Sequence, residues 1–156
     1  MNLHRNPLPA VLALGLVLLL TACEAISHAS ADPTTGLTAG TRAAYLKAAK
    51  AAKAAGFELR ITSGYRTPDQ QRAEFREAVG RYGSAEEAAK YVLPPEKSAH
   101  VKGTALDLGP EPAARWLEQT AGRYRLCRIY ANEWWHFEYR PSKRCPRLLP
   151  DGTHAR

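Results

Sequence analysis

Apolar residues follow three different spacings along the chain, and the first is a continuous run near its start. Leu8 to Leu20 are almost all apolar, and Arg5 places a positive charge just before them. A run of this length is too short to cross a bilayer as a helix but suits the core of a signal peptide. We therefore predict that residues 1–22 are a targeting segment and not part of the fold.

The residues that follow this run indicate a lipid attachment site. Leu20-Thr21-Ala22-Cys23 resembles a bacterial lipobox, in which the chain is cut before the cysteine and the cysteine receives lipid. We expect lipid on Cys23 to anchor the protein to the bacterial cell membrane, outside the cytoplasm. The alternative is an ordinary secretory signal that is cleaved nearby, which also exports the protein. Residues 23–36 are small and polar, which predicts a flexible tether.

Helical and strand spacings begin after the tether. Residues 41–55 are rich in alanine and lysine and precede a glycine, which predicts a helix with a glycine cap. Residues 57–62 alternate apolar and polar positions, as half-buried strands do. A capping box formed by Thr67 and Gln70 predicts a second helix, which we expect to end at Gly80.

The second half of the chain predicts three further elements and a short helix. Ser84 starts the short helix by the same capping signal, and residues 112–120 predict another helix. Residues 104–108 and 135–139 alternate as strands do. Helices and short strands without a regular βαβ repeat predict an α+β domain, with a small antiparallel sheet and flanking helices.

Chain length and net charge exclude fewer functions than the predicted export does. Without the targeting segment the chain fits one domain, which we place at residues 37–148, with a polar tail at 149–156. We expect a monomer. The 22 Lys and Arg residues exceed the 15 Asp and Glu residues and are scattered along the chain. This basic surface favours anionic cell-wall polymers or lipid head groups, and export argues against a nucleic-acid partner.

Two cysteines remain once Cys23 is assigned to lipid. Cys127 and Cys145 form an even pair in an oxidising compartment, which predicts a disulfide between them. The alternative is two unpaired thiols. On the loop-entropy model this bond stabilises the fold by about 3 kcal/mol.

Four residues form a candidate metal centre. His100, Asp107 and His136 supply two imidazoles and one carboxylate, which suit a zinc ion that keeps one coordination position open. Glu133 supplies the spare base that a hydrolytic zinc site needs. A regular strand would put Glu133 and His136 on opposite faces, so the hypothesis requires a turn between them. The alternatives are structural histidines and a surface carboxylate.

Three motifs in this order resemble those of VanY-type D-alanyl-D-alanine carboxypeptidases. These zinc peptidases share a superfamily with the VanX dipeptidases and a fold with the Hedgehog signalling domain. The resemblance covers residues 37–146 and departs from the common pattern at Trp134, where the family often has proline. The motifs are Ser63-Gly64-Tyr65-Arg66, Ser98-x-His100-x-x-Gly103-x-Ala105-x-Asp107 and Glu133-x-Trp135-His136.

The resemblance implies roles for the motif residues. One zinc ion would be held by the two histidines and the aspartate, and Glu133 would act as general base and then as general acid. Arg66 would hold the substrate's carbonyl oxygen or terminal carboxylate, unless it forms only a surface ion pair with Asp69 or Glu74. Gln71 and Ser98 are further candidates for substrate contact.

The activity that the resemblance implies is a zinc-dependent D,D-carboxypeptidase that removes the terminal D-Ala from peptidoglycan stem peptides. An L,D-carboxypeptidase or a peptidoglycan endopeptidase with the same zinc site is one alternative. A non-catalytic zinc module that binds the cell wall is another, because the Hedgehog relative shows that this architecture need not hydrolyse a bond.

Overall fold

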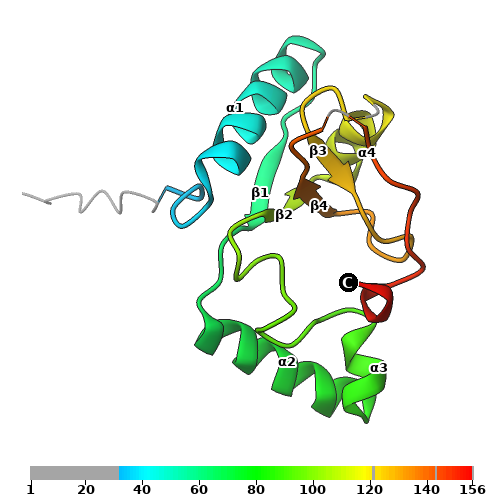
Figure 1. Cartoon of the computed structure of the whole chain (residues 1–156). Coiled ribbons are helices and arrows are strands. Elements are labelled where there is room, and N and C mark those ends of the chain that lie inside the picture. The colour runs from blue at the N-terminus through cyan, green and yellow to red at the C-terminus, as the bar shows by residue number, and fades with distance from the viewer. Residues whose placement is uncertain (1–31, 121, 143, 156) are drawn as a thin grey trace, which may run out of the picture. The chain divides into compact units, whose positions relative to one another are not determined.

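Four strands form one antiparallel sheet in the order β1-β2-β4-β3 (Figure 1). The computed structural model describes residues 32–120, 122–142 and 144–155. The predicted targeting segment and Cys23 lie outside these residues. The strands are β1 (Arg60–Ser63), β2 (Ala105–Gly109), β3 (Leu126–Arg128) and β4 (His136–Tyr139). The predicted α+β class with a small antiparallel sheet is confirmed.

Two helices cover one face of this sheet and form the core with it. α1 (Ala39–Ala54) and α4 (Glu111–Gln119) present small apolar side chains to the strands. Leu106 and Leu108 of β2 and Phe137 of β4 are fully buried in this cluster. Side chains alternate between the two faces of a strand, so Asp107 and His136 lie on the other face. The apolar core therefore determines which face carries the candidate site.

Two further helices lie at the opposite end of the domain from α1 (Figure 1). α2 (Pro68–Tyr82) begins with the predicted capping box, in which Thr67 and Gln70 exchange hydrogen bonds. The prediction that this helix ends at Gly80 is wrong, because α2 continues to Gly83, whose φ of 85° ends it. A glycine inside a helix costs about 1 kcal/mol, which the additional turn outweighs here. The short α3 (Ala85–Ala89) follows directly.

The remaining differences from the sequence prediction concern element boundaries and one strand. β1 begins at Arg60, three residues later than the apolar alternation indicated. β3 was not predicted, because three residues give too short a pattern. Residues 32–36, assigned to the tether, form a turn in which Thr34 is buried. Residues 32–36 therefore belong to the folded domain, which we had placed from residue 37.

The C-terminal segment, which we define as residues 144–155, packs on the domain although its end was predicted to be a tail. Cys145 forms a disulfide with Cys127 of β3, as predicted. Leu149 then pairs with Tyr130 in a parallel bridge, and the segment ends in the 3-10 helix η1 (Gly152–His154). Within the described part of the chain, no helix combines the length and apolarity needed to cross a membrane.

Candidate active site

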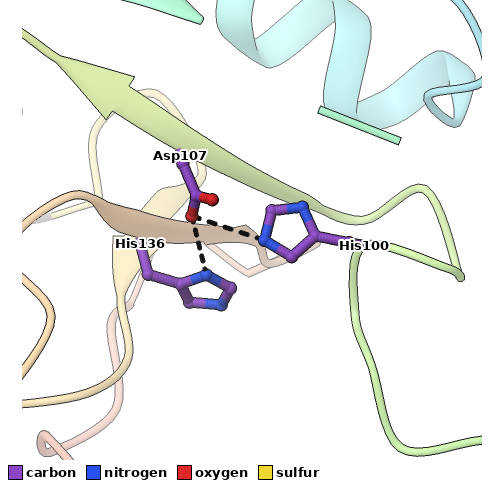
Figure 2. Close-up of side chains that lie close together, drawn as sticks. All are labelled: His100, Asp107 and His136. Carbon is purple, nitrogen blue, oxygen red and sulfur yellow. Dashed lines mark hydrogen bonds and ion pairs between the residues drawn. The ribbon is translucent and has the colours of Figure 1, made fainter. Parts of the chain in front are cut away.

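Three side chains that are distant in the sequence converge on the open face of the sheet (Figure 2). His100 comes from the loop before β2, Asp107 from β2, and His136 from the start of β4. Asp107 Oδ1 lies 3.3 Å from His100 Nε2 and 3.2 Å from His136 Nδ1. Asp107 and His136 are direct partners in the antiparallel pairing, so the sheet register itself brings them together. The structure thus gathers the three predicted metal ligands.

A backbone carbonyl sets the orientation of the His100 ring. His100 Nδ1 donates to Gly64 O at 2.7 Å, because a carbonyl oxygen can only accept. This bond leaves Nε2 unprotonated in the neutral ring and turned toward Asp107. Gly103 closes the turn after His100 with a φ of 66°, and a Cβ there would meet Gly36 O at 2.6 Å. A side chain at position 103 would therefore clash with Gly36 and strain the turn, which explains the glycine in this motif.

A carboxylate that the sequence analysis missed orients the second ring. Glu138 Oε1 lies 3.5 Å from His136 Nε2, and Arg140 donates to the other Glu138 oxygen at 2.9 Å. The ring of Tyr130 lies against that of His136, with centroids 5.2 Å apart. A histidine that binds a metal through one ring nitrogen commonly donates a hydrogen bond from the other ring nitrogen to a carboxylate. Glu138 follows His136 by two strand positions, so strand alternation was the signal that could have found it.

The donor set fits a divalent cation. The two outer hydrogen bonds put the ring protons on the far nitrogens, so two imidazole lone pairs and one carboxylate oxygen face each other. All three donor atoms lie within 4.8 Å of one another. Without a cation, protonation must relieve this crowding. Burial by itself would lower the pKa of His136, but hydrogen bonds to Asp107 and Glu138 raise it to about 10. Two nitrogens and one oxygen suit zinc.

Glu133 is buried beside this centre. It lies in the turn before β4, where its N–H donates to Tyr130 O, and its side chain is 6% exposed. Glu133 Oε2 is 3.8 Å from His136 Nδ1, so the turn that the hypothesis required is present. Burial, assisted by the nearby Asp107 charge, raises the pKa of Glu133 to about 7. A carboxylate with such a pKa exchanges protons at neutral pH.

Arg66 points into the site rather than to the surface. Its guanidinium contacts Asp107 Oδ2 at 3.0 Å and Ser63 Oγ at 2.7 Å, while Asp69 pairs with Arg72. Burial would raise the pKa of Asp107, but hydrogen bonds from the two histidine rings hold it well below its ordinary value. Arg66 therefore adds a positive charge next to the candidate metal ligands.

The candidate metal centre, Glu133 and Arg66 line one cavity with a volume of about 360 Å³. Gln71 and Ser98, the two further candidates for substrate contact, line it as well. Gln71 is buried, accepts from Arg66 at 3.1 Å and donates to Leu93 O at 2.8 Å. These contacts occupy its carbonyl oxygen and one of its two N–H groups, so Gln71 orients Arg66. Ser98 is 3% exposed and lies on the cavity wall.

Residues 34–142 match the family model "VanY: D-alanyl-D-alanine carboxypeptidase". The chain belongs to the VanY family. The match covers all four strands and every residue of the candidate site. VanY proteins are peptidases, so the fold and the gathered side chains belong to a hydrolase family that acts on peptidoglycan.

Individual VanY relatives agree with this assignment. A D-alanyl-D-alanine carboxypeptidase of Enterococcus faecalis (strain ATCC 700802 / V583) is 31% identical over 114 residues, covering 57% of this chain and 42% of the relative. The chain thus spans less than half the length of that relative.

Two solved structures share the fold. A mutant of the vancomycin resistance D,D-pentapeptidase VanY from a VanB-type cassette, in complex with Zn(II), has a TM-score of 0.62 and 25% identity, over 66% of this chain and 72% of that one. The LdcB LD-carboxypeptidase has a TM-score of 0.58 and 29% identity, over 69% and 67%. The solved structures that share this fold therefore include both D,D- and L,D-enzymes.

Proposed function

We propose that this protein is a zinc-dependent D,D-carboxypeptidase that removes the terminal D-Ala from peptidoglycan stem peptides. The observation that carries the proposal is a buried glutamate, Glu133, beside two imidazoles and a carboxylate in one cavity. A purely structural metal site has no need of such a base. The E. faecalis relative and the Zn(II)-bound VanY structure, each named for a D,D- or D-Ala-D-Ala activity, support the substrate class.

The residues divide the hydrolysis between them. A bound zinc ion would supply a Lewis acid and lower the pKa of water that it binds. Glu133 accepts a proton from the water whose oxygen bonds to the scissile carbonyl carbon. It then gives this proton to the amine nitrogen as the C–N bond breaks, so the products are a carboxyl group and a free amine. Its pKa near 7 suits both transfers, because the ideal acid–base group titrates near the working pH.

Arg66 supplies the charge that the substrate needs. Arginine is a cationic hydrogen-bond donor, so the guanidinium of Arg66 can hold a terminal carboxylate or a developing oxyanion. Gln71 keeps the guanidinium in place through a hydrogen bond of 3.1 Å. Ser98 lies on the same cavity wall and is proposed to contact the peptide backbone.

An L,D-carboxypeptidase is the second candidate, because two L,D-carboxypeptidases, LdcB and a DacB of Streptococcus pneumoniae, are 29% and 28% identical to this chain. Digestion of defined muropeptides, with products weighed by mass spectrometry, separates the candidates. A D,D-enzyme converts pentapeptides to tetrapeptides, and an L,D-enzyme converts tetrapeptides to tripeptides. Cleavage of internal bonds alone would contradict both and indicate an endopeptidase.

Glu133→Ala separates an enzyme from a non-catalytic zinc module. We expect the variant to bind one zinc ion per chain, because no predicted ligand is altered, and to lose hydrolysis by at least about a hundredfold. Metal content is measured by atomic emission on the same samples. Full activity in the variant would refute the role of Glu133.

We also propose that residues 1–22 are a signal peptide and that lipid on Cys23 holds the protein at the outer surface of the cell membrane. The apolar run and the Leu-Thr-Ala-Cys sequence support this. Cys23→Ser is expected to move the protein from the membrane fraction to the soluble exported fraction. A protein that stays membrane-bound after this change would contradict the lipid anchor.

A further inference from the structure

A second and larger cavity adjoins the candidate active site. Its volume is about 730 Å³, and it shares Ala99 and Tyr130 with the catalytic cavity as common walls. Glu138 of β4 lines it, two residues after His136, so both cavities lie along the same face of the sheet. We call this cavity the basic chamber.

Five cationic side chains line the basic chamber: Lys97, Lys102, Arg140, Arg144 and Arg147. The one carboxylate among its described lining residues, Glu138, is already bonded to Arg140 and His136. Within the described residues, none of the other four cations forms an ion pair. In addition, Arg140 Nε is buried without a hydrogen-bond partner. Four exposed cations without an ion-pair partner around one cavity, and a buried donor without an acceptor, indicate that the chamber accepts an anion.

The C-terminal segment builds one wall of the chamber. Arg144 and Arg147 belong to it, and it is fixed by the Cys127–Cys145 disulfide and by Leu149 N–H, which donates to Ile129 O at 2.8 Å. The family match ends at residue 142, so this wall is not part of what the VanY assignment covers. The same segment reaches the catalytic cavity through Gly152.

The position of the basic chamber relative to the candidate metal ligands indicates which anion it binds. Arg66 approaches the centre from the Asp107 side, whereas the chamber begins at Glu138 on the far side of His136. A peptide whose C-terminal end lies at Arg66 can therefore pass the centre and extend its earlier residues toward the chamber. Peptidoglycan stem peptides can carry a free carboxylate in those residues.

We propose that the basic chamber binds a carboxylate of the peptide substrate, upstream of the bond that is cleaved. This inference rests on the proposed function and adds a specificity site to it. The shared walls favour a group on the substrate over a separate polyanion, because a separate ligand would have no reason to lie next to the reaction centre. We assign the preference for a carboxylate over an uncharged group to Arg144 and Arg147.

The test compares two synthetic peptides that end in D-Ala-D-Ala and differ only in an upstream glutamate or glutamine. Binding is measured by calorimetry with the detergent-solubilised whole chain carrying Glu133→Ala, and hydrolysis is measured with the active chain. We expect the glutamate peptide to bind roughly tenfold more tightly, as charge-assisted hydrogen bonds allow. Raised salt should reduce this preference.

Variants then locate the preference. Arg144→Gln/Arg147→Gln should bring the affinity ratio of the two peptides close to one. Arg76→Gln/Arg123→Gln removes the same charge from exposed positions that line neither cavity, and should leave the ratio unchanged. Circular dichroism of both variants checks that they are folded. Loss of the preference only in the first variant supports the chamber.

The outcomes also separate the chamber from the proposed function. The chamber is overturned if the protein that keeps Arg144 and Arg147 binds both peptides equally. It is also overturned if Arg144→Gln/Arg147→Gln keeps the preference, even if both peptides are hydrolysed. A preference that depends on these arginines without hydrolysis by the active chain supports the chamber and overturns the proposed function. Tight binding of inorganic polyphosphate through the same arginines, with equal peptide binding, would assign the chamber to a polyanion and overturn the carboxylate.

Discussion

Glu133→Gln should make the metal-free protein more stable at high pH, although it removes the proposed catalytic base. Burial raises the pKa of Glu133 from an ordinary 4.5 to about 7. A group whose pKa is raised in the folded state stabilises the fold below its unfolded pKa, and this contribution is lost as the pH rises through the folded pKa. The ionised glutamate therefore opposes folding above pH 7.

The magnitude follows from the distance between the two pKa values. Each pH unit corresponds to about 1.4 kcal/mol, so the difference between 4.5 and about 7 gives about 3 kcal/mol at pH 8. At pH 5 most of the native Glu133 is protonated, and the cost falls to about 1 kcal/mol. Glutamine resembles the protonated acid in shape and carries no charge. The variant should thus gain about 3 kcal/mol at pH 8 and about 1 kcal/mol at pH 5.

Urea denaturation of chelator-treated protein at these two pH values measures the effect. Glu138→Gln is the matched control with the opposite sign. Burial would raise the pKa of Glu138, but its hydrogen bond with His136 and the charges of His136 and Arg140 lower it. Its carboxylate therefore stabilises the fold above its unfolded pKa, and Glu138→Gln should destabilise the protein at pH 8. A Glu133→Gln gain that is the same at both pH values would refute the reasoning.

Four further measurements test the site and its support. Removal of metal by a chelator should abolish hydrolysis while far-UV circular dichroism stays unchanged, because the sheet core and not the ion holds the ligands. Glu138→Gln should weaken zinc binding roughly 10–100-fold in competition with a chromophoric chelator, since it removes the partner of a ligand histidine. Replacing Cys127 and Cys145 together by alanine should lower the unfolding free energy by about 3 kcal/mol in urea. Arg66→Lys keeps the charge but loses the fork that contacts Asp107 and Ser63, so kcat/KM should fall at least about tenfold in a D-Ala release assay.

The sequence predicted the side chains of the site better than their neighbours. His100, Asp107, Glu133 and His136 were found because their residue types and spacing suit one known kind of metal chemistry. The antiparallel register brings Asp107 and His136 together, whereas His100 and Glu133 reach the same cavity from the segments before β2 and β4.

What the sequence did not predict depends on contacts between distant segments. Glu138 has no motif of its own, and its contact with His136 is recognised only when the strand is in place. Tyr130 packs on His136 from an irregular segment, for which hydrophobic spacing carries no information. Residues 149–155 were assigned to a tail because they are polar, yet they pack on the domain. Neither local propensity nor composition reports the bridge between Leu149 and Tyr130.

The apolar core and the candidate metal centre lie on opposite faces of the same two strands, β2 and β4. Leu106 and Phe137 are fully buried, and burial of such a side chain contributes about 2 kcal/mol to folding. Any slip of β2 against β4 by one residue would expose both and would also separate Asp107 from His136, since strand side chains alternate. The energy that fixes the register therefore fixes the donor geometry. The sheet can thus keep two imidazole rings and a carboxylate close together and hold Glu133 at a pKa that is unfavourable for folding but suited to proton transfer.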